Sequence, residues 1–239
     1  SQPEKPKNSQ DNRKRLKLDL FGIIDVITLL TGAIYGELDK RLSLKDALLK
    51  ALKKPVPRHI NVMHCFGGLT FLLFVNQIVT GILLAFYYKP TVTEAYSSVI
   101  FITTKVSFGW LIRQLHAWGA NLMILMLFLH MLRVIIHGAY KSPREFTWVS
   151  GTFLLLLTIT FGFTGYLLPW DQLSYWATTV GTEIAGSVPV IGKFILIMLR
   201  GGENVSGATL TRFYAIHTLI LPWVTTFFLV IHFLLVRLL

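Results

Sequence analysis

Four long stretches free of Asp, Glu, Lys and Arg constrain what this chain can fold into. They cover positions 60–88, 114–132, 146–170 and 213–236. About 20 apolar residues in a helix cross a hydrocarbon core of about 30 Å, so each stretch has the length of a span. The stretches therefore predict an all-α membrane protein with four transmembrane helices, which run alternately outward and inward.

Composition argues against a water-soluble enzyme and against a nucleic-acid-binding protein. Of the 239 residues, 53% are apolar and 15% are charged, against about 45–50% and about 25% in soluble domains. The net charge of +11 by itself suggests nucleic acid. However, residues 1–58 hold 13 of the 23 Lys and Arg. Basic residues placed before and between apolar stretches are typical of the positive-inside bias of membrane proteins.

The N-terminal region, residues 1–58, is predicted to lie outside the bilayer core. Residues 1–17 carry almost no apolar side chains, which predicts a disordered tail. Residues 21–36 are short for a span and include Asp25, so we expect an interfacial helix. Residues 44–54 have one apolar and one basic face and predict a second surface helix. A transmembrane domain over 59–239 follows this region.

The loop charges predict the orientation in the membrane. The loop after the second stretch carries three basic residues and one acid, and Arg237 ends the fourth, whereas the loop after the first is nearly neutral. Both ends of the chain are therefore expected on the cytoplasmic side. Residues 171–212 then form a long outer excursion, where Tyr175, Trp176 and Phe194 suit an interfacial helix.

Histidines inside the second and fourth stretches are the strongest functional candidates, because ionisable side chains are costly in a membrane. The second stretch contains His116 and His130, and the fourth contains His217 and His232, at spacings of 14 and 15 positions. In a helix, 14 steps span about 21 Å and return within about 40° of one face, and 15 steps span about 22 Å and return within about 60°. His116 and His217 would share an outer level, and His130 and His232 an inner one. Two facing imidazoles at each level suit two bis-histidine haems, with no open position for oxygen.

Glycines repeat this spacing in the other two stretches. Gly67 and Gly81 are separated by 14 positions, as are Gly151 and Gly165. A macrocycle inside a four-helix bundle requires close backbone approach, and only glycine lacks a Cβ. By the alternating helix directions, Gly81 and Gly165 fall at the outer level, and Gly67 and Gly151 at the inner one. The shared period indicates a di-haem four-helix bundle.

Each of these residues also has a simpler interpretation. A membrane histidine can be a hydrogen-bonding polar residue, and membrane glycines commonly serve helix packing. His59, His64 and His137, at or beyond helix ends, are interpreted as interface residues. Arg113 and Arg144 suit pairing with haem propionates, with anchoring at the membrane surface as the alternative.

The chain from Cys65 to Arg237 closely resembles cytochrome b6 and the short cytochrome b of bacterial menaquinol–cytochrome c oxidoreductases. The resembling segments are YYKPTVTEAYSSV at 87–99, FGWLIRQLHAWGANLM at 108–123, KSPREFTWVSG at 141–151, GYLLPWDQLSYW at 165–176 and TLTRFYAIHTLILP at 209–222. The resemblance implies that the outer haem b is bound by His116 and His217, and the inner haem b by His130 and His232.

Cys65 gains its interpretation from this resemblance. As a lone cysteine without a CxxCH motif, it is by itself interpreted as a small buried residue. In the cytochrome b6 type, a cysteine at this place holds an extra haem c through a single thioether, without a side-chain axial ligand. The resemblance implies that role for Cys65, with Arg237 near this haem and near the inner quinone site.

The resemblance also implies a reaction. Quinol would be oxidised at the outer face, where one electron passes to a Rieske iron–sulfur protein and on to a c-type cytochrome or plastocyanin. The other electron would cross through the two haems to a quinone at the inner side, with protons released outside and taken up inside. Pro169, Trp170, Asp171 and Tyr175 would supply this chain's share of the outer quinol pocket. Interface anchoring by the two aromatic residues and a solvated loop position for Asp171 are the alternatives.

Three departures from the family pattern stand out. Ala117 replaces the usual arginine after the first histidine and Gly119 replaces a common serine, which leaves the local charge at the outer haem open. The extension before Pro57 is longer than usual, and no function is assigned to it. The part of the outer quinol site that carries the PEWY motif is absent and is expected on a separate subunit. A homodimeric complex in a bacterial plasma membrane or a thylakoid-type membrane is the family expectation.

Two other function classes make different predictions. A di-haem membrane anchor of a hydrogenase or formate dehydrogenase would keep the histidine pairs but lack the PWDQ segment and Cys65. A four-helix transporter or assembly protein would bind no haem. Haem spectra with a haem-stained denaturing gel distinguish all three.

Overall fold

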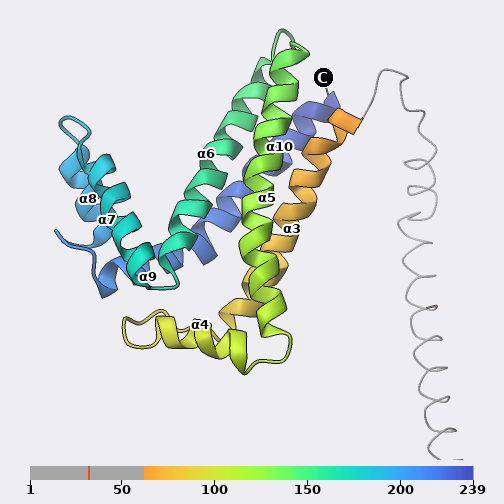
Figure 1. Ribbon diagram of the computed structural model, residues 1–239. Helices are drawn as coiled ribbons and strands as arrows, with labels where there is room; N and C mark the ends of the chain where they lie inside the picture. Colours follow the sequence, from red (N-terminus) through yellow and green to blue (C-terminus); the bar gives the residue numbers. More distant parts are fainter. Residues whose placement is uncertain (1–31, 33–61, 239) are drawn as a thin grey trace, which may run out of the picture. The chain divides into compact units, whose positions relative to one another are not determined.

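Four helices are long and apolar enough to cross a membrane, which confirms the predicted all-α architecture with four candidate spans among the described residues. The computed structural model describes Gly32 and residues 62–238 (Figure 1), and no strand occurs within this part of the chain. Apart from Gly32, the predicted tail and surface helices of residues 1–58, and His59, lie outside the described residues.

Each span is built from one or more regular elements. The first joins a 3-10 turn to an α-helix, the middle two are single α-helices, and the fourth contains a π-turn between two α-helices. The elements are η1 (Val62–Cys65), α3 (Phe66–Ala85), α5 (Gly109–Ile136), α6 (Glu145–Leu167), α9 (Gly207–Ala215), η2 (Ile216–Ile220) and α10 (Leu221–Leu238).

Helix α5 is longer than the uncharged stretch 114–132 that predicted it. It begins after Phe108, whose φ of 58° places the backbone in the left-handed region, and it includes Arg113 and Arg133. Both arginines lie about one turn from an end, and from there a long side chain reaches the membrane surface. A charge-free stretch therefore marks the part of a span inside the bilayer core, and the helix itself extends beyond it.

Helix α6 ends before its predicted limit of Trp170, at Leu167. Pro169 has no N–H with which to continue the helix, and Trp170 has a left-handed φ of 52°. The Asp171 carboxylate then accepts a hydrogen bond from the Ser174 N–H (2.8 Å), and Ser174 Oγ accepts one from the Asp171 N–H (2.9 Å). This capping box starts the next helix and fixes the direction of the chain after the span.

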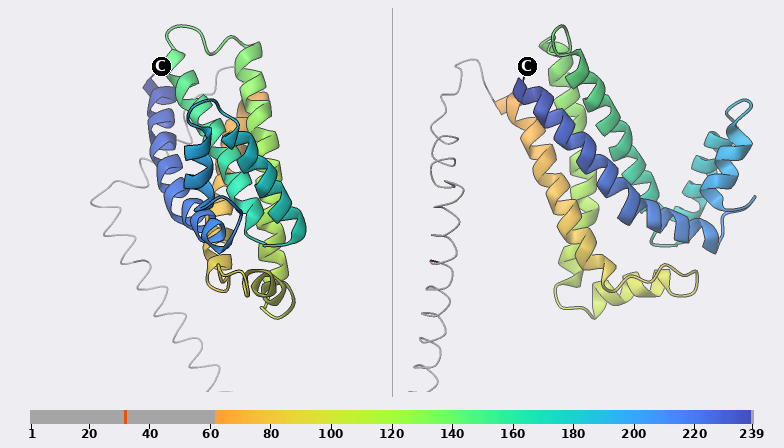
Figure 2. Two further views of the ribbon diagram at one scale, coloured as in Figure 1. Left: turned by 90° about the vertical axis from the view of Figure 1, so that its left-hand side faces the viewer. Right: turned by 180° about the vertical axis from the view of Figure 1, so that it is seen from behind.

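The spans pack as two helix pairs. Among the described helices, α3 packs along α5 and α10 packs along α6, whereas α5 and α6 make less contact with each other. Figures 1 and 2 show that the start of α3 and the end of α10 lie at the same end of this bundle. The end of α5 and the start of α6 lie there too, so the four spans alternate in direction as predicted.

Within residues 62–238, three further helices lie outside the cores of the spans. Helix α4 (Ala95–Thr104) lies crosswise at the other end of the bundle (Figure 1). Helices α7 (Gln172–Gly186) and α8 (Gly192–Arg200) form a hairpin beside the bundle. The hairpin occupies the predicted outer excursion. Tyr175 and Trp176 lie on α7 and Phe194 lies on α8, where Trp176 and Phe194 are exposed.

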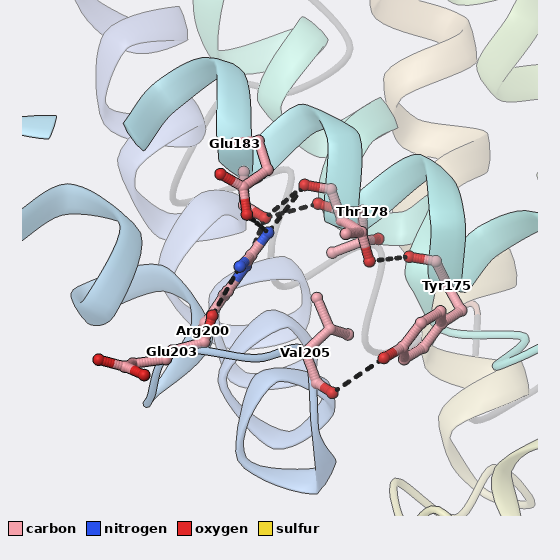
Figure 3. A network of polar contacts seen from close by, with 8 residues as sticks. Tyr175, Thr178, Glu183, Arg200, Glu203 and Val205 are labelled. Carbon is pink, nitrogen blue, oxygen red and sulfur yellow. Dashed lines mark hydrogen bonds and ion pairs between the residues drawn. The ribbon is translucent and has the colours of Figure 1, made fainter. Parts of the chain in front are cut away.

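Arg200 is only 2% exposed and connects α8 to α7 through hydrogen bonds (Figure 3). Its Nε donates to Thr182 Oγ1 (2.7 Å), Nη1 donates to the Glu203 carbonyl (2.7 Å), and Nη2 donates to the Thr179 carbonyl (2.9 Å). Nη2 also lies 2.9 Å from Glu183 Oε1, on a side chain that is 61% exposed. A buried guanidinium is stable here because every one of its nitrogen atoms has an acceptor.

Arg200→Met is expected to loosen this hairpin without unfolding the transmembrane bundle. The substitution leaves the Thr182 hydroxyl and the Glu203 carbonyl without the donor they have now, and the Thr179 carbonyl with one donor fewer, which costs about 2–3 kcal/mol of local stability. Hydrogen exchange of the amides over 187–206 is therefore expected to accelerate about 30-fold or more. Lys193→Met removes a positive charge from the exposed face of α8 and is the matched control. Equal exchange rates in the two variants would contradict the structural role of Arg200.

Candidate functional site

The two outer histidines face each other across the boundary between the helix pairs. His116 lies on α5 and His217 lies in η2, and their ring centroids are 6.4 Å apart with an interplanar angle of 70°. An imidazole nitrogen binds a transition metal at about 2.0 Å, so two imidazoles on opposite sides of one metal have centroids about 6.3 Å apart. The spacing of these rings therefore fits one metal ion bound between them.

Each glycine of the repeated spacing lies directly against the histidine of its own level. An ideal Cβ built on the glycine would lie 2.6 to 3.3 Å from Cε1 of the facing imidazole, so a side chain there would push the ring away. The facing pairs are Gly81 with His116, Gly165 with His217, Gly67 with His130, and Gly151 with His232. The glycines of α3 and α6 thus admit the imidazoles of α5, η2 and α10.

Three hydroxyl groups hold the imidazoles from the side, and the sequence patterns did not identify them. Thr80 Oγ1 lies 2.9 Å from His116 Nδ1, Ser150 Oγ lies 2.9 Å from His232 Nδ1, and Thr164 Oγ1 lies 3.1 Å from His217 Nδ1. In each case the hydroxyl residue directly precedes the facing glycine. A Ser-Gly or Thr-Gly dipeptide opposite a histidine was the available sequence signal.

A π-turn explains why the two histidine spacings differ by one position. In η2 the Leu221 N–H bonds to the Ile216 carbonyl, five positions back. Pro222 follows directly; its ring would clash with the Thr218 carbonyl of a regular helix and it offers no N–H. A π-turn accommodates one extra residue in an α-helix. The spacing from His217 to His232 is therefore equivalent, in a regular helix, to the shorter spacing of the two histidines on α5.

The inner histidines line a cavity of about 430 Å³ between the helix pairs. Its wall includes His130, His232, Gly67 and Gly151 and is mostly apolar. This size lies within the range of about 300–1,000 Å³ that is typical of cofactor pockets. A flat, largely apolar group with axial positions for two imidazoles fits these walls.

Three buried polar atoms in this wall have no hydrogen-bond partner among the described residues. They are Arg133 Nε, Thr147 Oγ1 and Thr225 Oγ1, and all three residues line the inner cavity. Buried polar groups are rarely left without a hydrogen-bond partner. Such a group often lines a site where a ligand supplies the missing partner. Unpaired donors in an otherwise apolar cavity suit a macrocycle that carries carboxylates, such as haem.

Only some of the candidate arginines line the inner cavity. Arg144 lines the inner cavity, as does Arg133, which the sequence patterns used only for orientation. Arg133 lies one turn after His130, just as Arg113 lies one turn before His116. Helical spacing from a histidine indicated Arg113 and could have indicated Arg133 in the same way. Arg113 is half-buried, whereas Arg237 is exposed and lies outside the described cavity wall.

Cys65 lies beside the inner cavity but outside its wall. It is the last residue of η1, its thiol is free and exposed, and Gly67 and His64 near it do line the cavity. The His64 ring contacts the His137 ring edge-on at 5.6 Å, so two of the histidines interpreted as interface residues lie together near this end. A group attached to Cys65 would therefore lie on a different side of the helix from the His130 imidazole.

The candidate quinol-pocket residues form a tight aromatic corner after α6. Trp170 contacts Tyr175 edge-on at 5.8 Å, next to Pro169. The Tyr175 hydroxyl lies 3.5 Å from the Val205 carbonyl (Figure 3). Asp171 uses one carboxylate oxygen to cap α7, so the structure gives it a positioning role.

Tyr88 reaches this corner from the end of the first span. Its hydroxyl donates to the Leu168 carbonyl at 2.6 Å, just after the end of α6. Its ring stacks on Tyr214 at 5.4 Å. Burial raises the pKa of Tyr88 above its ordinary value, and neighbouring Tyr214 raises it further. The phenol therefore stays protonated and keeps donating at any physiological pH.

Gly119 departs from the resembling family for a visible reason. An ideal Cβ on Gly119 would collide with the side-chain amides of Asn76 and Gln77 on α3. Asn76 Nδ2 donates to the Leu115 carbonyl at 3.1 Å. Glycine at 119 therefore makes room for two amides where serine would not. Ala117 is exposed, and nothing in the structure explains its departure.

Comparisons with known proteins find one matching family model, related sequences and a related structure. The family model described as Cytochrome b/b6/petB matches residues 51–239. Proteins named cytochrome b6 from Prochlorococcus marinus (strain MIT 9211) and Synechococcus sp. (strain RCC307) are each 49% identical over 207 residues, which cover 87% of this chain and 95% of each relative. A solved structure titled hyperthermophilic respiratory complex III matches with a TM-score of 0.79 and 35% identity over 84% of this chain. The chain spans about half, 54%, of the matched chain in that structure.

Proposed function

This chain belongs to the cytochrome b/b6 family, and from this premise we propose that it is the cytochrome b subunit of a quinol:electron-carrier oxidoreductase of the b6f or bc type. In this proposal, electrons from quinol cross the membrane and protons are moved with them. Membership of the family implies haem b. The observation that carries the proposal is that four histidines lie at two depths, each opposite a glycine.

The proposed cofactors are two haems b, bound by His116 and His217 at the outer level and by His130 and His232 at the inner one. When bound, the haems supply one-electron redox centres at two depths of the bilayer. The glycines keep the imidazoles in place, and the apolar cavity wall excludes water. Arg133 and Arg144 would pair with the inner propionates, and Arg113 with an outer one, because guanidinium suits bidentate carboxylate recognition.

The aromatic corner after α6 is proposed as this chain's share of an outer quinol pocket. Pro169 ends the helix and so leaves backbone groups without helical hydrogen bonds. Trp170 and Tyr175 would present flat apolar faces to a quinol ring. Asp171 sets the direction of α7 through its cap, and Tyr88 fixes the Leu168 carbonyl. Protons would leave at this end and enter at the other, where both chain termini are proposed to lie on the cytoplasmic side.

The remaining partners are proposed from the family. They are a Rieske iron–sulfur protein, a c-type cytochrome, a separate subunit that completes the quinol pocket, and a second copy of the complex. Cys65 is proposed to hold a haem c through one thioether, which is compatible with its exposed thiol. Arg237, exposed near the end of α10, would lie near that haem and an inner quinone.

Cys65→Ser is the variant that tests the cofactor assignment. The purified wild-type complex is expected to give two extractable haems b per chain by pyridine haemochrome, and one haem that remains on the chain in a haem-stained denaturing gel. Cys65→Ser is expected to keep both extractable haems and lose the gel-resistant one, because the chain has no other cysteine. A gel-resistant haem in the variant, or none in the wild type, would refute the thioether at Cys65. A wild-type complex without haem would refute the whole proposal.

A further inference from the structure

The structure determines which atom donates and which accepts in the hydrogen bonds between three of the histidines and their neighbouring hydroxyl groups. Each hydroxyl has one proton, and Thr80 Oγ1 is 2.6 Å from the Asn76 carbonyl on its own helix. The hydroxyls of Thr164 and Ser150 are likewise 2.8 and 2.9 Å from a carbonyl one turn back. A carbonyl can only accept, so the proton of each hydroxyl goes to the carbonyl. Toward the imidazole, each hydroxyl oxygen therefore acts as an acceptor.

An acceptor at Nδ1 fixes the form of the imidazole. The Nδ1 atoms of His116, His217 and His232 must carry the proton, which leaves the Nε2 lone pair of each ring free. A metal-binding histidine needs this arrangement, because the nitrogen opposite the metal usually donates to an outer partner that fixes the ring. The hydroxyls thus prepare three imidazoles for binding iron through Nε2.

His130 is the exception. The glycine that faces it, Gly67, is preceded by Phe66, and no hydroxyl or other hydrogen-bond partner of His130 is found among the described residues. The backbone relationship is nevertheless the same, since an ideal Cβ on Gly67 would lie 3.0 Å from His130 Cε1 and 3.2 Å from Nδ1. The outer level has two imidazoles with hydroxyl partners, whereas the inner level has one.

We infer that Thr80, Thr164 and Ser150 are positioning residues that set the reduction potentials of the two haems, and that Phe66 makes the inner site unequal to the outer one. This inference rests on the proposed function, because it needs the haems. An acceptor at Nδ1 makes the imidazole a stronger electron donor, which favours the ferric state and lowers the potential. Removing an acceptor therefore raises the potential of that haem, and adding one lowers it.

The Thr80–His116 pair gives the clearest test. The carbonyls of Phe161 and Thr147 also offer hydrogen bonds to the rings of His217 and His232, whereas Thr80 is the one acceptor recorded for His116 among the described residues. Thr80→Val removes this acceptor and keeps the shape of the side chain. In a potentiometric titration of the purified complex, we expect one haem b to become about tenfold easier to reduce, about 59 mV for one electron, and the other to stay unchanged.

Matched variants separate the hydroxyl from general packing. Thr80→Ser keeps the acceptor and is expected to titrate as the wild type. Thr226→Val removes an exposed hydroxyl that bonds only to its own helix on α10, and it is also expected to leave both potentials unchanged. Thr164→Val is expected to move the same haem as Thr80→Val, and Ser150→Ala the other one, each by less because a carbonyl remains.

Phe66→Thr tests the same idea in the opposite direction. It places a hydroxyl beside Gly67, where the other three sites have one, and is expected to lower the potential of the haem that Ser150→Ala raises. Phe66→Leu keeps the site apolar and is the control. A shift in both Phe66 variants, or in neither, would overturn the assignment of the inner asymmetry to this residue.

The possible outcomes distinguish this inference from the proposed function. A complex without haem b refutes the proposed function. A complex with two haems b whose potentials are equal in Thr80→Val and in the wild type refutes the inference and leaves the function standing. A shift in Thr80→Val that Thr80→Ser shares also refutes it, because the hydroxyl is then not the cause. If Thr80→Val alone fails to assemble, the two Phe66 variants decide.

Discussion

Gly165→Ala is expected to abolish stable binding of the outer haem. An ideal Cβ at this position lies 2.6 Å from Cε1 of His217, closer than Cβ atoms approach other atoms in proteins, and 3.2 Å from its Nδ1. The ring has little freedom to move, because Thr164 holds it on one side and the π-turn fixes its backbone. Displacing a ligand costs at least as much as losing an outer partner, about 10- to 100-fold in affinity.

Gly162→Ala is the matched control for this prediction. It lies on the same helix, one turn earlier, and an added Cβ would only reach ordinary contact with Ile124 Cδ1 at 3.4 Å. Haem b per chain in the purified complex is expected to fall from two to one in Gly165→Ala and to remain two in Gly162→Ala. Two haems in both variants would show that the space beside His217 is not limiting.

Deleting Thr218 in a chain that also carries Pro222→Ala is expected to leave both haems bound, although it shortens the fourth span by one residue, because the alanine removes the ring that would clash in a regular helix. The residue lies in the π-turn, whose extra residue can be removed to give a regular helix. His217 and His232 would then have the same spacing as the two histidines of α5. Both imidazoles would keep their level and their face.

An insertion in the same span is expected to have the opposite effect. One alanine added between Thr226 and Phe227 lies in regular helix and rotates everything after it by about 100°. His232 would turn away from the cavity and from Ser150, so the inner haem is expected to be lost. Haem counts and difference spectra of the two variants test the pair. Loss of the inner haem in the deletion would contradict the role given to the π-turn.

The membrane spans and the levels of the histidines could be predicted from the sequence because both rest on simple physical rules. A bilayer excludes charge over about 20 residues, and a helix repeats its faces with a fixed period. Those two rules are enough to place His116 with His217 and each glycine at its level. They describe regular helices in lipid and nothing more.

The features that the sequence patterns missed are those for which these rules do not hold. Helix α4 is too short for a span and was not predicted, and the outer excursion was expected to hold an interfacial helix where the chain forms two, α7 and α8. The capping role of Asp171 is likewise not evident from the sequence, because a capping box is recognised only when Ser174 is seen to return the hydrogen bond. The π-turn depends on Pro222 within a helix that otherwise continues.

Contacts between segments far apart in the sequence could not be predicted either. Thr80 and His116 are far apart in the sequence, and Ser150 and His232 are further apart still, so no local pattern connects them. Arg133 was assigned to a loop because a charge usually ends an apolar stretch, yet α5 continues past it to Ile136. The contacts around the four histidines thus needed the structure, whereas the levels of the histidines did not.

The pairing of the four histidines is tested most directly by counting and titrating haem b in four single variants, His116→Ala, His217→Ala, His130→Ala and His232→Ala. The structure pairs the first two at the outer level and the last two at the inner one. We expect His116→Ala and His217→Ala to lose the same haem, identified by its potential and its difference spectrum, and the other two variants to lose the remaining one. Loss of one haem in common by His116→Ala and His130→Ala, or full retention in any variant, would contradict the account.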